Sequence, residues 1–120
     1  MNTTAPKIAI LLIAFNRLDL LERRINELHD ERIRHFPFFV AIDGPRVHKS
    51  NDLKENLLII KRVKQERYLS PQLIQRNRNY GCDLHIPMAI EEVLEKNDGV
   101  IVIEDDVQML PDAILQIAFE

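Results

Sequence analysis

The sequence contains a single cysteine, and this scarcity excludes both a disulfide framework and a cysteine-based metal site. Cys82 cannot form an intrachain disulfide, and it has no CxxC partner or nearby cysteine and histidine ligands. The four histidines show no HExxH spacing and no i, i+4 pairing, so we interpret them as surface or packing residues. A reducing, cytoplasmic setting is the expectation that follows.

Long hydrophobic runs and glycine-rich phosphate loops are also missing. The apolar stretch 8–15 is too short to span a bilayer, and no small-residue cleavage signal follows it, so we expect a core strand there and no transmembrane segment. No GxGxxG or GxxxxGK[ST] motif follows it, which argues against the usual dinucleotide and NTP sites. The net charge of −3 gives no general electrostatic reason to bind nucleic acid or an anionic membrane surface.

What the sequence does contain is a regular alternation of strand and helix patterns. The 120 residues, 46% hydrophobic and 29% charged, suit one compact domain, residues 1–120. Apolar segments typical of strands occupy residues 7–15, 36–42, 73–74 and 100–103. Apolar residues at helical spacing lie between them: Leu18, Leu21, Ile25 and Leu28, then Leu53, Leu57, Ile60 and Val63 within residues 51–67, then Ile86, Ala89, Ile90, Val93 and Leu94.

Local signals suggest where the helices begin. We expect Asn16 to cap the first helix and Pro87 to lie in the first turn of the third. Pro111 and Asp112 could open a fourth helix, whose pattern reaches the last residue, Glu120. The alternation predicts an α/β fold, an open, doubly wound, mostly parallel sheet with helices on both faces, and the unfinished pattern suggests a truncated domain.

The most informative segment is Val100 to Asp106, where four apolar residues lead directly into three carboxylates. A buried strand cannot carry three carboxylates inside, so they must emerge at its C-terminal end. Three like charges there are unfavourable unless a cation or hydroxyl donors share them, as happens at metal-assisted diphosphate sites. The alternative is a solvated acidic turn.

Polar groups follow each of the other strands as well. These groups are Asn16 with Arg17, Asp43 with Gly44, and residues 76–79. Parallel pairing places them with the acidic triplet along one edge, where open α/β sheets bind ligands. This edge offers carboxylates for a cation and for hydroxyls, and arginines for phosphate.

These segments resemble the nucleotide-binding half of nucleotide-sugar glycosyltransferases with the A-type fold, in particular N-acetylglucosaminyltransferase I and related bacterial sugar transferases. The likeness covers essentially the whole chain. It consists of IAFNR at residues 13–17, IDG at 42–44, NYG at 79–81, and IEDDV at 103–107 with Pro111 and Asp112 behind it.

The resemblance assigns the acidic residues to a sugar donor. It implies that Asp106 ligates a divalent ion, Mn²⁺ or Mg²⁺, that bridges the phosphates of a UDP-sugar. By the same likeness Glu104 meets the ribose hydroxyls and Asp105 the donor sugar. The alternative for Glu104 is that it caps the strand end or pairs with an arginine.

The likeness also assigns two residues on the neighbouring loops. Asp43 resembles the acid that receives the uracil N–H, and Arg17, next to Asn16, resembles the arginine that approaches the diphosphate. The alternatives are turn chemistry alone for Asp43 and a solvated helix residue for Arg17. Arg76 and Arg78 are weak candidates that the spacing does not assign.

The chain departs from this family in length. A whole catalytic domain is about twice as long, and its second half supplies the acceptor site, a lid and the catalytic base, so the base is expected beyond Glu120. The first hypothesis is an enzyme, or its donor-binding half, that transfers a sugar to an acceptor hydroxyl with inversion. The others are a non-catalytic nucleotide- or metal-binding module and an interaction domain. We expect self-association through an uncovered apolar face formed by Ile114, Ile117 and Phe119.

Overall fold

The computed structural model describes residues 5–119, and its elements follow the predicted alternation. In chain order they are β1 (Ile8–Ala14), α1 (Leu18–Glu27), β2 (Phe38–Ile42), α2 (Asp52–Gln65), β3 (Gln72–Gln75), α3 (Cys82–Leu94), β4 (Gly99–Glu104) and α4 (Pro111–Ala118). The strands form a parallel sheet in the order β3-β2-β1-β4. The predicted open α/β architecture is confirmed.

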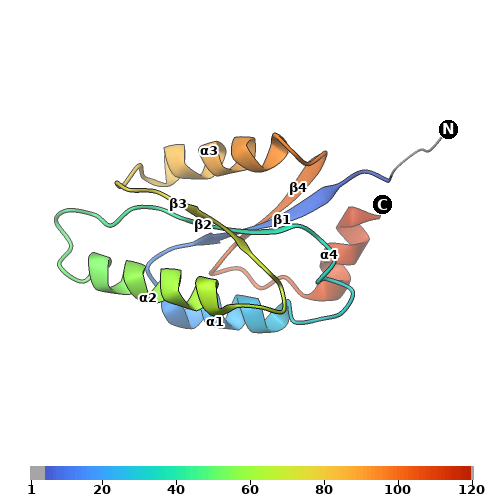
Figure 1. Ribbon diagram of the computed structural model, residues 1–120, viewed down its shortest axis with the longest axis horizontal. Coiled ribbons are helices and arrows are strands. Elements are labelled where there is room, and N and C mark those ends of the chain that lie inside the picture. The colour runs from blue at the N-terminus through green and yellow to red at the C-terminus, as the bar shows by residue number, and fades with distance from the viewer. Residues whose placement is uncertain (1–4, 120) are drawn as a thin grey trace.

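Helices cover both faces of this sheet, as the doubly wound arrangement requires. Figure 1 shows α3 on one face and α1, α2 and α4 on the other. A large core that includes Ile25, Ile59 and Ile114 lies on the face of α1, α2 and α4. A smaller core that includes Ala89 and Val93 lies under α3. The sheet is therefore the middle layer of three.

Strand β1 lies at the centre of both cores. Every side chain from residue 9 to residue 14 is at most 1% exposed. Successive side chains of a strand point to opposite faces, and accordingly Leu12 joins one core while Leu11 joins the other. Burying each of the four Leu and Ile side chains among them contributes about 1.5–3 kcal/mol. This two-sided burial explains why the segment is apolar throughout instead of alternating.

Two predicted helix starts are wrong. Asn16 is not the cap of α1, because Arg17 occupies the N-cap position and no side chain caps the helix. Pro87 lies inside α3 and not in its first turn, because that helix begins earlier, at Cys82. The polar residues of this additional turn look like loop in the sequence, but the carbonyl of Gly81 accepts the first helical hydrogen bonds.

The predicted apolar stripe of α2 is also partly wrong. Leu53 and Leu57 are 58% and 56% exposed, whereas the polar Asp52 and Asn56 are buried. The carboxylate of Asp52 pairs with Arg46, and the side-chain amide of Asn56 donates to the Asp43 carbonyl oxygen at 2.8 Å. Because these polar groups are satisfied, they can occupy the inner face at the start of the helix.

Helix α4 is better covered than the sequence suggested. Ile114 is fully buried in the larger core, whereas Ile117 and Phe119 are 52% and 76% exposed. The expected uncovered face is therefore reduced to its last turn. Within residues 5–119, no helix combines the length and the apolar character needed to cross a membrane.

Candidate functional site

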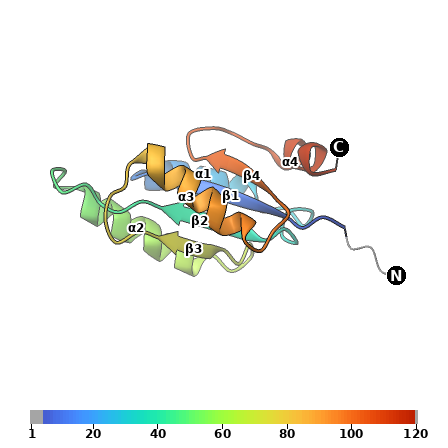
Figure 2. The ribbon, with the colours of Figure 1, turned by 90° about the horizontal axis from the view of Figure 1, so that it is seen from above.

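The four strands end side by side at the carboxyl edge of the sheet. Ala14 is paired with Ile42, Ile42 with Gln75, and Ile13 with Glu104. The strands run in the same direction beneath α3 in Figure 2. The loops that follow them therefore meet at one edge, which is the convergence that the sequence pattern predicted.

The carboxylate of Asp43 ties the end of β2 to the loop after β3. Its Oδ1 accepts hydrogen bonds from the backbone N–H groups of Gly44 (2.8 Å) and Tyr80 (2.9 Å). Its Oδ2 accepts from the N–H of Gly81 (2.9 Å) and from Nδ2 of Asn79 (3.3 Å). Four donors match the four acceptor positions of an ionised carboxylate. These contacts favour the turn alternative for Asp43, and its contact with uracil stays a prediction.

Gly44 allows the same two loops to approach closely. A Cβ at this position would lie 2.2 Å from the carbonyl carbon of Arg78 and 2.4 Å from its oxygen. The Gly44 carbonyl oxygen also accepts a hydrogen bond from Nδ2 of Asn79 at 2.8 Å. Glycine is required here by space, since any side chain would push the two backbones apart.

Of the two weak arginine candidates, Arg76 is engaged within the fold. Its guanidinium pairs with Glu92 of α3 at 2.7 and 3.2 Å, and its Nε lies 3.3 Å from Nδ1 of His85. Burial lowers the pKa of His85, which is consistent with its being a packing residue. Arg78, in contrast, is exposed and lies over the ring of Tyr80 at 4.6 Å. Arg78 is the one of the pair that offers a cation to solvent at this edge.

The three carboxylates at the end of β4 have different environments. Glu104 and Asp106 are exposed, whereas Asp105 is 1% exposed. The Oδ2 of Asp105 accepts a hydrogen bond from the N–H of Phe15 at 2.9 Å, and its backbone N–H donates to the carbonyl of Ile13 at 3.1 Å. The middle residue thus fastens the loop to the end of β1, and the outer two face solvent.

The buried position of Asp105 changes its acidity. Burial raises the pKa of Asp105; the hydrogen bond from Phe15 opposes this effect, and the charge of Asp106 adds to it. Because the side chain has almost no accessible surface, a contact with a donor sugar would require this loop to open. That contact stays a prediction from the resemblance.

Asn16 and Arg17 lie in the loop after β1, next to the triplet. Asn16 is half-buried and Arg17 is exposed. The charge of Arg17 acts against the rise in the pKa of Asp105. The arrangement suits a diphosphate contact, and the alternative of a solvated residue that precedes α1 fits the same exposure.

The exposed carboxylates fit a metal ion of one particular kind. Within the described range, no three His, Cys, Asp or Glu side chains are arranged to hold a metal ion, and no ion pair joins Glu104 to an arginine. Mg²⁺ is usually held by one or two carboxylates with phosphate oxygens and water, and Mn²⁺ favours the same oxygen ligands. The exposed carboxylate of Asp106 fits an ion that a diphosphate helps to bind.

One residue that was not predicted from the sequence, Arg24, contacts the loop after β4. Arg24 of α1 is only 8% exposed, although charged residues of an amphipathic helix are expected on its solvent face. Its Nη1 donates to the carbonyl oxygen of Asp105 at 3.1 Å. The signal was present, because Arg24 lies three residues after Leu21 and four before Leu28, within the apolar stripe.

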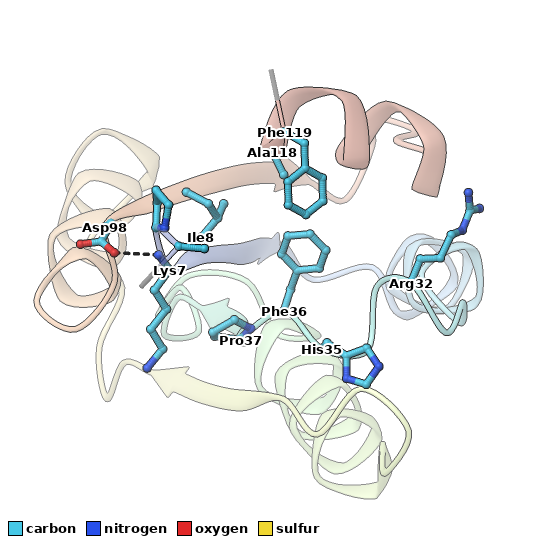
Figure 3. A pocket seen from close by; sticks show the side chains of 11 residues that line it. Lys7, Ile8, Arg32, His35, Phe36, Pro37, Asp98, Ala118 and Phe119 are labelled. Carbon is cyan, nitrogen blue, oxygen red and sulfur yellow. Dashed lines mark hydrogen bonds between the residues drawn. The ribbon is translucent and has the colours of Figure 1, made fainter. Parts of the chain in front are cut away.

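A groove of about 790 Å³ lies at the opposite edge of the sheet, where Lys7, Pro37 and Asp98 precede β1, β2 and β4. Figure 3 shows Phe36 and Phe119 facing each other in it, with ring centroids 6.2 Å apart. The groove is mainly apolar and lies far from the acidic triplet along the strands. The candidate site therefore rests on the loops of the carboxyl edge and not on this groove.

No family model matches the sequence, and no curated protein matches it. Among solved structures, the fold is similar to that of the mannosyltransferase PcManGT from Pyrobaculum calidifontis, solved in complex with GDP-Man and Mn²⁺. The TM-score is 0.57 at 12% sequence identity, and the match covers 87% of this chain and 28% of that chain. The likeness shows a shared fold, and this chain spans less than a third of the mannosyltransferase.

Proposed function

We propose that this chain is the donor-binding part of a metal-dependent nucleotide-sugar glycosyltransferase. The observation that carries the proposal is that the exposed Glu104 and Asp106 lie at the end of β4 and the exposed Arg17 follows the neighbouring β1, at the carboxyl edge of an open parallel sheet. Ligands of such sheets bind outside this edge. The fold shared with a protein solved with GDP-Man and Mn²⁺ supports the same class.

Each residue has a distinct part in the proposal. Asp106 holds the divalent ion, Arg17 donates to the diphosphate, and Glu104 accepts from the ribose hydroxyls, with Asn16 beside them. A guanidinium fork matches phosphate geometry. The bound ion supplies charge stabilisation as the nucleoside diphosphate departs. Asp105 contributes by fixing the loop, whereas its contact with the sugar rests on the resemblance alone.

The finer parts of the proposal rest on the composition of the sequence and on its resemblance to the family. These are UDP as the nucleotide, inversion at the transferred sugar, the narrower likeness to N-acetylglucosaminyltransferase I, a catalytic base beyond Glu120, a cytoplasmic setting, and self-association through the end of α4. The structural neighbour holds GDP-Man, so both UDP and GDP belong in any binding test.

A second candidate function is donor binding without transfer. It requires only the exposed polar residues at the carboxyl edge, Arg17, Glu104 and Asp106, which this chain contains. An assay for sugar transfer by the 120-residue chain tests the expected position of the base. Turnover would contradict a base beyond Glu120, whereas binding without turnover agrees with both candidate functions.

The test of the site is calorimetric titration of UDP and GDP with Mn²⁺ or with a chelator, using Asp106→Ala and the exposed Glu95→Ala as a matched control. We expect binding in Mn²⁺ to weaken at least about tenfold in Asp106→Ala, as for metal ligands and their partners in general. Glu95→Ala should bind like the parent. Equal affinity in Mn²⁺ and in chelator for the parent chain contradicts the proposal.

A further inference from the structure

An ion pair on α1, formed by Arg24 and Glu27, contacts the loop after β4 at Asp105 and at Gln108. Arg24 donates from Nη1 to the Asp105 carbonyl oxygen at 3.1 Å and from Nη2 to Oε2 of Glu27 at 3.0 Å. The same Oε2 accepts a hydrogen bond from Nε2 of Gln108 at 3.0 Å. The two contacts reach the backbone of Asp105 and the side chain of Gln108, so they lie on either side of the proposed metal ligand, Asp106.

The ion pair contributes little net stability to the fold, because removing two charges from water costs free energy. Arg24 is 8% exposed, and the side chain of Glu27 is 17% exposed. Their Nε and Oε1 atoms are 2.8 Å apart, yet neither atom has a partner in hydrogen-bonding geometry. Buried ion pairs can often be replaced by apolar residues with no loss of stability. Stability alone therefore gives no strong reason for this arrangement.

We propose that Arg24 and Glu27 are positioning residues that hold Asp106 in the geometry in which it binds the divalent ion, an inference that rests on the proposed function. Asp106 is exposed in a turn, so its direction depends on its neighbours. Partners that orient a metal ligand commonly contribute 10- to 100-fold to metal affinity or activity. Helix α1 thus fixes the conformation of the loop that carries Asp106 before nucleotide and metal bind.

The test compares nucleotide binding with stability in the same variants. The double variant Arg24→Met, Glu27→Met replaces the pair with apolar side chains, and Arg23→Met removes an exposed arginine from the next position. Calorimetry measures UDP and GDP affinity in Mn²⁺, and urea unfolding measures stability. Hydrogen exchange at the Val107 amide, which donates to the carbonyl of Glu104 at 3.0 Å, reports on the loop without ligand.

We expect the double variant to unfold at no lower urea concentration than Arg23→Met, to bind at least about tenfold more weakly, and to exchange the Val107 amide faster. A merely structural pair would lower stability and affinity together. Affinity within twofold of the parent, or a loss that only follows unfolding, overturns the proposal. If the parent itself shows no Mn²⁺-dependent binding, the proposed function fails and this inference fails with it.

If the double variant does not fold, Gln108→Ala tests the positioning role instead. Gln108 is exposed, so its replacement should leave the fold intact. Losing its hydrogen bond to Glu27 should weaken Mn²⁺-dependent nucleotide binding about two- to tenfold. Parent-like affinity in this variant also overturns the positioning role.

Discussion

Replacing Asp43 with asparagine tests how the loops after β2 and β3 are held together. The carboxylate accepts two donors on each oxygen. An asparagine amide keeps one oxygen and turns an NH₂ group toward the other two donors, so two hydrogen bonds are lost. A hydrogen bond to a charged group contributes about 1.5–3 kcal/mol. Because Asp43 is only half-buried, we expect the free energy of unfolding to fall by about 2–4 kcal/mol in total.

Urea and thermal unfolding measure this loss, and the melting temperature should fall by about 10 °C for a chain of this size. Asp83→Asn is the matched control, since Asp83 is exposed in the first turn of α3 and should change stability by less than about 0.5 kcal/mol. A loss below this value for Asp43→Asn refutes the four-donor account.

The same variant decides between the two roles of Asp43. The resemblance predicts that UDP binding weakens more than binding of inorganic diphosphate, because the uracil contact is lost. The occupied acceptor positions instead predict equal losses for both ligands, because the loop moves as a whole. We expect equal losses, and a selective loss for UDP would return Asp43 to base recognition.

Three further predictions concern stability and its pH dependence. Gly44→Ala should cost at least about 2 kcal/mol by collision with the facing backbone, and Gly81→Ala, which has open space but a φ of +79° and a ψ of 156° that only glycine adopts readily, should cost about 1–3 kcal/mol; urea unfolding of both measures the two losses. Burial acts to raise the pKa of Glu66, but the Leu69 N–H and two basic side chains lower it overall, so its stabilisation is lost as pH falls through the folded-state pKa. Glu66→Gln should therefore cost about 3 kcal/mol at pH 7 and flatten acid unfolding, and an unchanged acid profile would contradict this. Burial raises the pKa of Asp105, so the free energy of unfolding declines as pH rises from the ordinary carboxyl range through the folded-state pKa. Melting curves across pH should show that Asp105→Asn removes this decline. A steeper decline in the variant than in the parent would contradict this prediction.

The sheet was predictable because its signals are local and strong. The apolar run around β1 could only be a strand covered on both faces, and the alternation with helices fixed the parallel topology. Once the strands are parallel, the polar residues that follow them must share an edge. The grouping of Arg17, Asp43 and Asp106 therefore follows from the pattern.

The contacts within that edge could not be predicted, because they join residues distant in the chain. The hydrogen bond between Arg24 and Asp105 spans 81 positions. The burial of Asn56 depends on the carbonyl of Asp43, and the backbone N–H of Gly81, just before α3, donates to the Asp43 carboxylate 38 positions away. In each case a tertiary partner overrides the local preference for solvent or loop.

The most direct test of the central claim is to locate bound Mn²⁺ and GDP or UDP on the protein by paramagnetic broadening of backbone amide signals. The account predicts that residues 15–17, 43–44, 79–82 and 104–107 broaden, that this requires nucleotide, and that Asp106→Ala abolishes it. Broadening at the groove that contains Phe36 and Phe119, or none at the carboxyl edge, would contradict the account.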